Sequence, residues 1–306
     1  MRVNGSTLQL GVPAEFDLAA AVCSYGYFML EPNRWAPDSR RLLRPLRGDR
    51  ERIVHVRISQ TRRGTLRIGC DRRLARAEAG RIRRQVARML RIDEDFTAWR
   101  RIHPQARRAG FDRLFRSPDF FEDAVKTITA CNVSWSNTIT MNRLLCKRIG
   151  GGGFPTPRQL AATSPIRLRR SCRVGYRADR IVGLARSIVR GETDLSWLED
   201  PQRTTDEIHD RLLEIDGIGP YSAANLCQHL GRYDRLAIDT ETYRHVTGRR
   251  GGSRLPNRAA MDRRIRARYQ KYRPYQFLAY WFELWTGYEG IEARRHEGTK
   301  ETVASK

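Results

Sequence analysis

The sequence predicts an α+β fold, in which an N-terminal domain with a small antiparallel β-sheet and helices (residues 1–103) precedes a mostly α-helical domain (residues 104–306). Two observations predict it. Before Asp71, apolar residues alternate with polar ones, which is the period of a strand with one buried face. After Asp71 they recur at helical spacing, and beyond His103 almost every segment has the pattern of a helix. A chain of 306 residues is long enough for two such domains.

The first domain is predicted to contain one short helix and a β-hairpin. The helix is expected from Asp17 to Cys23. In the run from Val54 to Ile58, valine and isoleucine alternate with polar residues, which indicates a strand. The Arg-Arg-Gly sequence at 62–64 predicts a turn into a second strand from Thr65 to Ile68.

The helical region is divided by glycine, proline and capping residues. Helical spacing places Ile82, Val86, Met89 and Leu90 on one face. Further along the chain, Ser117-Pro118-Asp119 is expected to open a helix with proline in its first turn. Other helices are expected from Trp135 to Ile149 and around Ile181 to Ile188, with a glycine- and proline-rich loop at 151–157 between them.

Two short helices joined by Gly-Ile-Gly are predicted next from local signals. Thr204 and Glu207 form a capping box, and the helix that they begin is expected to end at Asp216-Gly217. Pro220 occupies the first position of the following helix, and Gly231 marks its end.

The aromatic-rich segment from Tyr269 to Tyr288 is predicted to be a core helix near the C-terminus. Phe277, Trp281 and Leu284 share one face of that helix. The polar segment from Arg294 to Lys306 is expected to be frayed.

Composition favours a polyanionic partner and excludes several protein classes. A formal net charge of +24 draws a protein onto nucleic acid, although the dominance of arginine over lysine also fits a GC-rich genome. No apolar run is long enough for a transmembrane helix, and the N-terminus lacks a signal peptide, so we expect a cytoplasmic protein, nucleoid-associated if bacterial, with no membrane partner. The six cysteines are too scattered for a zinc or iron–sulfur site and are expected to be structural thiols.

The Gly-Ile-Gly turn is a candidate anion site. Gly217 and Gly219 remove side chains where the backbone must approach another surface. The amides of the turn and of the helix that begins at Pro220 lack partners within that helix, so they can hold one phosphate. An ordinary tight connection between two helices is the alternative interpretation.

Asp239 follows Gly219 by 20 residues, which is far enough for one helix out and one extended segment back. The carboxylate therefore can share a cleft with the phosphate anchor. Asp239 also precedes Thr-Glu-Thr, which makes it a good helix N-cap, and the two roles are compatible.

The segment from Leu212 to Arg244 resembles the signature of the helix–hairpin–helix DNA glycosylase superfamily, an L-x-x-[IL]-x-G-[IV]-G-x-x-[ST]-A motif followed by an apolar stretch and an aspartate. The matching residues are Leu212, Ile215, Gly217, Ile218, Gly219, Ser222, Ala223 and Asp239. RSPDFFEDAVKTITACNVSW, GFPTPRQLA and VGYRADRIVGLARSI are similar to helices of the 3-methyladenine and 8-oxoguanine glycosylases. With FDLAAAVCSYGYFMLEPNRW included, the resemblance covers most of the chain.

The resemblance implies a monomeric enzyme that flips a damaged base out of double-stranded DNA and cuts its N-glycosidic bond, with Asp239 as the catalytic carboxylate. Strand-cutting members carry a lysine where this chain has Tyr221, and Lys126 lies at a position without that role. The expected enzyme is therefore monofunctional, acts on an alkylated purine and leaves an abasic site. The alternatives are an oxidised-purine (8-oxoguanine-type) glycosylase with lyase activity and a non-catalytic helix–hairpin–helix DNA-binding protein.

The resemblance also implies roles for other residues. Tyr221 and Trp281 would line the base pocket, with core packing as the alternative for Trp281, while Gly217, Gly219 and Ser222 would bind the DNA backbone. Asn132 would insert into the duplex, or else cap a helix. No cofactor is required, although the carbonyls of Leu213, Ile215 and Ile218 would be able to hold a structural K⁺ or Na⁺. The absence of cysteine after Cys227 argues against the C-terminal iron–sulfur cluster of other branches.

Overall fold

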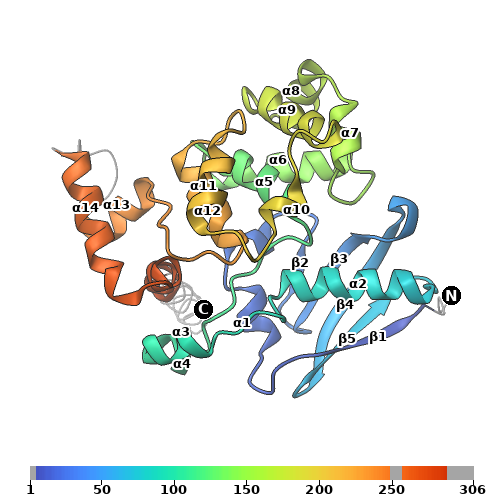
Figure 1. Cartoon of the computed structure of the whole chain (residues 1–306). Coiled ribbons are helices and arrows are strands. Elements are labelled where there is room, and N and C mark those ends of the chain that lie inside the picture. The colour runs from blue at the N-terminus through green and yellow to red at the C-terminus, as the bar shows by residue number, and fades with distance from the viewer. Residues whose placement is uncertain (1–4, 249–256, 288–306) are drawn as a thin grey trace, which may run out of the picture.

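The computed structural model describes residues 5–248 and 257–287 (Figure 1). Its N-terminal part is a five-stranded antiparallel sheet with strand order β1-β5-β4-β3-β2, and helix α2 lies across one face of it (Figure 1). The strands are β1 (Thr7–Gly11), β2 (Arg34–Ala36), β3 (Arg41–Arg47), β4 (Ile53–Arg62) and β5 (Thr65–Cys70). The predicted α+β fold is therefore confirmed.

The predicted hairpin is the β4–β5 pair. Val54, Val56 and Ile58 are buried on the side of α2, while the residues between them are exposed or half-buried. Gly64 adopts a φ of +76° in the turn, a backbone conformation that favours glycine. The predicted helix near Asp17 is α1 (Leu18–Val22), and Asp17 caps it by accepting a hydrogen bond from the Ala20 amide.

The rest of the described chain is almost entirely helical. The α-helices that follow the sheet are α2 (Arg76–Met89), α3 (Thr97–Ile102), α4 (Pro104–Arg108), α5 (Phe120–Ala130), α6 (Trp135–Arg148), α7 (Pro157–Ala161), α8 (Pro165–Cys172), α9 (Arg177–Val189), α10 (Leu195–Leu198), α11 (Thr205–Leu213), α12 (Pro220–His229), α13 (Thr240–Thr247), α14 (Arg258–Tyr269) and a last helix at 276–287. Short 3₁₀ helices are η1 (Gly26–Met29), η2 (Asp49–Glu51) and η3 (Gln270–Tyr272).

Two helix ends differ from the sequence prediction. Helix α5 begins only at Phe120, because Asp119 caps it by accepting a hydrogen bond of 2.9 Å from the Glu122 amide, so Pro118 lies outside its first turn. Helix α11 ends at Leu213, before the predicted Asp216-Gly217. The chain from 214 to 219 forms a turn of its own.

Two hydrophobic cores hold the molecule together. The first joins the sheet and α2 to the helix at 276–287, so it unites both ends of the described chain. The second lies among α5, α6, α8, α9, α11 and α12. The first core therefore contains residues from both sides of residue 103, and the domain boundary predicted there stays a prediction.

The predicted helix from Tyr269 to Tyr288 is wrong in its first third. Helix α14 ends at Tyr269, η3 follows, and Pro274 cannot continue a helix because it lacks an amide hydrogen. Phe277 and Leu284 are buried on the last helix, as predicted. Tyr288 and the segment from Arg294 to Lys306 lie outside the described residues.

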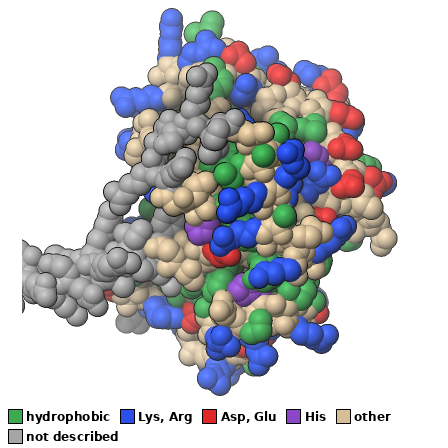
Figure 2. Space-filling view, turned by 90° about the vertical axis from the view of Figure 1, so that its left-hand side faces the viewer, with side chains coloured by type: hydrophobic (Ala, Val, Ile, Leu, Met, Phe, Trp, Pro, Cys, Tyr) green, Lys and Arg blue, Asp and Glu red, His purple; other side chains and the backbone are tan. Residues whose placement is uncertain are grey.

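The described surface is mixed in charge. Figure 2 shows Lys and Arg side chains among hydrophobic ones across the middle of the face on which α13 and α14 lie, while Asp and Glu gather toward its upper right edge. Among residues 5–248 and 257–287, no helix has the length and apolar character needed to cross a membrane.

Candidate active site and nucleic-acid interface

Helices α11 and α12 and the turn between them form the predicted helix–hairpin–helix, called the hairpin below. Thr204 and Glu207 cap α11 reciprocally, with hydrogen bonds of 2.8 and 3.2 Å. Pro220 is the first residue of α12, and Gly231 follows the helix with a φ of +81°. These local predictions are confirmed.

The two glycines of the turn have different physical roles. Gly217 has a φ of +84°, and a Cβ at this position would lie 2.5 Å from the Arg180 side chain. Gly219 has an extended backbone, and a Cβ there would meet nothing within 4 Å. Gly217 therefore serves the fold, whereas the bare backbone of Gly219 leaves space for another molecule.

The first turn of α12 presents amides that have no partner within the helix. Ser222 is buried, and its hydroxyl lies 3.2 Å from Cys131 Sγ, so that side chain points into the protein. Any contact of Ser222 with DNA would use its amide.

Asp239 lies at the N-cap of α13 and is half-buried. Its Oδ1 accepts hydrogen bonds of 2.9 Å from both the amide and the hydroxyl of Thr242. The Thr242 hydroxyl in turn lies 2.9 Å from the Tyr280 hydroxyl. Within the described residues, every hydrogen bond to this carboxylate goes to Oδ1, so Oδ2 can act on a ligand. The predicted capping role is confirmed, and it orients the carboxylate.

Tyrosines from three parts of the chain lie near enough to Asp239 for its charge to act on them. Burial raises the pKa of the hydroxyls of Tyr25, Tyr221 and Tyr280, and the nearby charge of Asp239 raises all three further. These tyrosines are therefore neutral near pH 7. Tyr25 precedes η1, Tyr221 lies on α12 and Tyr280 on the last helix.

Trp281 joins this aromatic group. Its ring centroid is 4.6 Å from that of Tyr25, and its Nε1–H donates a hydrogen bond of 2.8 Å to the Ser24 carbonyl. Its ring also stacks on Phe277, at 6.1 Å between centroids. The side chain is half-buried, so the pocket and the packing interpretations both describe it.

Asn132 lies in the connection between α5 and α6. It is exposed and has a left-handed φ of +50°. Cys131 is the C-cap of α5 and Ser134 is the N-cap of α6, so Asn132 directly follows the C-cap of α5, a position where a left-handed residue commonly ends a helix. The Arg177 guanidinium donates hydrogen bonds to the carbonyls of Cys131 and Asn132, which holds this connection in place.

Sequence reasoning missed a basic and aromatic group at the start of α9. Tyr176 is 48% exposed, and the guanidinium carbons of Arg177 and Arg180 lie 4.6 and 4.9 Å from its ring centroid. Arg180 also packs against Gly217, while Arg177 binds the Asn132 connection. The group thus links that connection to the hairpin, and the sequence signal was two arginines spaced i, i+3 after an exposed aromatic residue.

Lys126 is fully buried and pairs with Glu122 at 2.7 Å, next to the ion pair between Glu122 and Arg44. Burial lowers the pKa of its amine. The amine therefore belongs to the interior.

The carbonyls of Leu213, Ile215 and Ile218 lie at the end of α11 and in the turn. The Ile215 carbonyl accepts a hydrogen bond of 3.0 Å from the Ile218 amide, which leaves its second lone pair for a ligand. Among the side chains that the structure describes, no group of three or more His, Cys, Asp or Glu residues is placed to hold a metal ion.

No family model and no curated protein matches the chain. Solved structures do match it. The 3-methyladenine DNA glycosylase from Archaeoglobus fulgidus is 19% identical, covers 91% of this chain and 97% of its own, and superposes with a TM-score of 0.69. MBOgg1, solved with a low-affinity DNA ligand, is 20% identical over 94% and 96% of the chains, with a TM-score of 0.68.

The apo form of the 8-oxoguanine glycosylase/lyase from Clostridium acetobutylicum is 15% identical over 91% of this chain and 95% of its own, with a TM-score of 0.66. At such identities the likeness concerns the fold. The expectation from the sequence resemblance is thereby confirmed at that level: the chain has the fold of the helix–hairpin–helix DNA glycosylases.

Proposed function

We propose that this protein is a monofunctional DNA glycosylase that acts as a monomer on double-stranded DNA. It flips out a damaged base and hydrolyses the bond between base and sugar. The observation that carries the proposal is Asp239, whose Oδ1 is held by Thr242 and whose charge acts on the buried hydroxyls of Tyr221 and Tyr25. A protein that only bound DNA would need Asp239 as a helix cap but would gain nothing from its negative charge near phosphate.

The reaction needs one fixed negative charge. As the bond from C1′ to the base nitrogen breaks, the base leaves with the electron pair and the sugar becomes oxocarbenium-like. Asp239 stabilises that charge and accepts a proton from the water that forms the new C1′–O bond. The products are the free base and an abasic site.

Tyr221 supports hydrolysis rather than strand cutting. A lyase needs an amine that forms a Schiff base with the sugar. In this chain the corresponding position of the hairpin carries a neutral phenol, and Lys126 is buried against Glu122. The attacking group is therefore water.

We further propose that the damaged base is an alkylated purine. Such a base carries a positive charge, leaves as a neutral molecule and stacks favourably on electron-rich rings. Tyr221 and Trp281 would supply these rings, and the ring centroid of Tyr25 lies 4.6 Å from that of Trp281.

The phosphate backbone would lie on the hairpin. Gly219 and the first amides of α12 would bind one phosphate, and Arg180 adds positive charge beside Gly217. Asn132, exposed on the connection that Arg177 holds, would fill the gap left by the flipped base. We place the enzyme in the cytoplasm, on the nucleoid in a bacterium.

A monovalent K⁺ or Na⁺ would fit the turn, because carbonyl oxygens suit such ions. The carbonyls of Leu213, Ile215 and Ile218 would hold it. The ion would stiffen the turn that presents the phosphate-binding amides.

The experiment is base release from duplexes that each carry one defined lesion, scored with and without alkali. We expect release of an alkylated purine, and strand breaks only after alkali. Strand breaks without alkali would overturn the monofunctional assignment. Release of an oxidised purine alone would overturn the proposed substrate, and no release from a broad panel would favour the DNA-binding alternative.

A further inference from the structure

We propose that the outward face of the β-sheet, called the outer face below, is a second nucleic-acid site that binds the phosphate backbone and is separate from the hairpin. The outer face is the side of the sheet opposite α2. Burial alternates along every long strand, and the residues on this side are exposed or half-buried. At one end of the sheet, Arg47 on this side donates hydrogen bonds to the carbonyls of Gly150 and Phe154 and to the side chain of Gln159 on α7.

The outer face carries an arginine array set by strand register. Arg41 and Arg67 flank Ser59 on the neighbouring strands, and Arg34 and Arg57 flank Leu43 one row away. Arginine thus alternates with a smaller or apolar residue in both directions. Diagonal neighbours on adjacent strands are roughly 7–8 Å apart. The result is a zigzag of four guanidinium groups across β2, β3, β4 and β5.

No acidic residue on the strands neutralises the positive charge of the array. The five strands contain seven arginines and no Asp or Glu. Arg34, Arg41, Arg57 and Arg67 are exposed, and within the described residues none of them forms an ion pair. By contrast, the inward-facing Arg44 is paired with Glu122. Charge that the fold leaves unpaired in this way attracts an anionic ligand.

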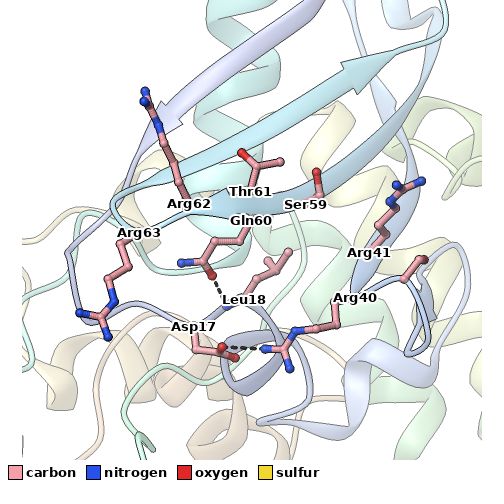
Figure 3. A pocket seen from close by; sticks show the side chains of 10 residues that line it. Asp17, Leu18, Arg40, Arg41, Ser59, Gln60, Thr61, Arg62 and Arg63 are labelled. Carbon is pink, nitrogen blue, oxygen red and sulfur yellow. Dashed lines mark hydrogen bonds and ion pairs between the residues drawn. The ribbon is translucent and has the colours of Figure 1, made fainter.

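The outer face is also hollowed. One hollow of about 430 Å³ is lined by arginines together with Ser59 and Thr61. Figure 3 shows these two hydroxyls between Arg41 on one side and Arg62 and Arg63 on the other. Its one carboxylate, Asp17, is bound to Arg40 at 2.7 Å. A second hollow of about 370 Å³ shares Arg41, Ser59 and Thr61 and extends toward Arg57 and Arg67.

A nucleic-acid backbone fits this arrangement better than other anions. The diagonal step between arginines is close to the distance between neighbouring phosphates of an extended strand, and the hydroxyls between them are suitable phosphate donors. The outward-facing strand residues include no Phe, Tyr or Trp, so the surface lacks a platform on which bases stack. It therefore binds backbone without reading sequence. Such a site would hold the protein on DNA away from the lesion.

The experiment measures binding of the full chain to an undamaged duplex as salt is raised. The outer-face variant carries Arg41→Gln, Arg57→Gln and Arg67→Gln. The control variant carries Arg158→Gln, Arg167→Gln and Arg170→Gln, three exposed arginines on α7 and α8, and removes the same net charge. Thermal unfolding of both variants shows whether each is folded.

We expect the slope of log affinity against log salt to fall by about 2.7 in the outer-face variant, since each lost phosphate contact removes about 0.9. Between about 50 and 200 mM salt, the wild-type affinity would then fall roughly 40-fold more than that of the variant. The control should change the slope far less. Equal changes in the two variants would overturn the proposal, because net charge alone would then explain them.

Two further measurements complete the test. When the outer-face variant is combined with Gly219→Ala, the two changes in binding free energy should add, as expected for separate sites. If they do not add, the substituted residues belong to one site. Loss of binding to anionic phospholipid vesicles with unchanged duplex binding would instead assign the outer face to a membrane surface. Since the duplex is undamaged, the outcome does not depend on whether the protein excises a base.

Discussion

Replacing Asp239 by Asn separates the two roles of this residue, the helix cap and the charge. Asn caps helices about as well as Asp, and its side-chain oxygen can accept the amide hydrogen bond that Oδ1 now accepts from Thr242 at 2.9 Å. We therefore expect Asp239→Asn to change the free energy of unfolding by less than about 0.5 kcal/mol. Asp239→Ala removes the cap and should cost about 1 kcal/mol.

The expected effect on base excision is much larger. Both variants lose the negative charge that, in the proposed reaction, stabilises the oxocarbenium-like sugar, so the single-turnover rate should fall about 100- to 10,000-fold. That range corresponds to roughly 2.7–5.4 kcal/mol of transition-state stabilisation. If Asp239 had only a structural role, the excision rate would fall only in proportion to the loss of stability. Asp239→Asn would then be nearly as active as the wild type.

The assay combines single-turnover excision at saturating enzyme with unfolding in denaturant. Asp239→Asn that keeps excision within about threefold of the wild type would refute the catalytic role, since that factor is under 1 kcal/mol. If Asp239→Asn is as unstable as Asp239→Ala, the inferred equivalence of the two caps is wrong instead.

Three further predictions concern the hairpin, the start of α9 and the interior. Gly219→Ala should leave the melting temperature nearly unchanged but weaken duplex binding, whereas Gly217→Ala should destabilise the fold by 1 kcal/mol or more, as about that much is usual for a side chain forced to positive φ. Tyr176→Ala should weaken binding of duplex DNA several-fold at unchanged stability in an equilibrium titration, and unchanged binding would contradict its place at the interface. Burial lowers the pKa of His229 to about 3, so the unfolded chain takes up a proton below pH 6.5 that the folded chain does not. The free energy of unfolding should therefore decrease as the pH is lowered from 6.5 to 4, by up to about 1.4 kcal/mol per pH unit. Denaturant unfolding at several pH values should show a weaker pH dependence for His229→Phe.

Local signals in the sequence predicted the elements well where one residue decides a boundary. Thr204, Glu207 and Pro220 place the hairpin helices, and the alternation from Val54 to Ile58 predicts one strand with a buried face. These features depend on neighbours in sequence. The prediction of one helix from Tyr269 to Tyr288 failed because it gave the aromatic residues more weight than Pro274. Proline interrupts a helix however hydrophobic its neighbours are.

The candidate site was predictable only in part. Asp239 and the glycines follow from a spaced motif, but the inward direction of the Ser222 hydroxyl depends on its contact with Cys131, 91 residues away. The positions of Arg177 and Arg180 likewise depend on packing between α9, the hairpin and the connection after α5. Periodicity along one element carries no information about such contacts.

The hydrogen bond from Trp281 to Ser24 spans 257 residues, nearly the whole described chain. A contact between residues so far apart in sequence has very high contact order, so we expect the proposed pocket wall to form late in folding. On the ribosome, the sheet and the hairpin emerge before the last helix does. The proposed DNA-binding surfaces can therefore emerge while the proposed base pocket is still open, and we expect excision to require that the helix at 276–287 has been synthesised.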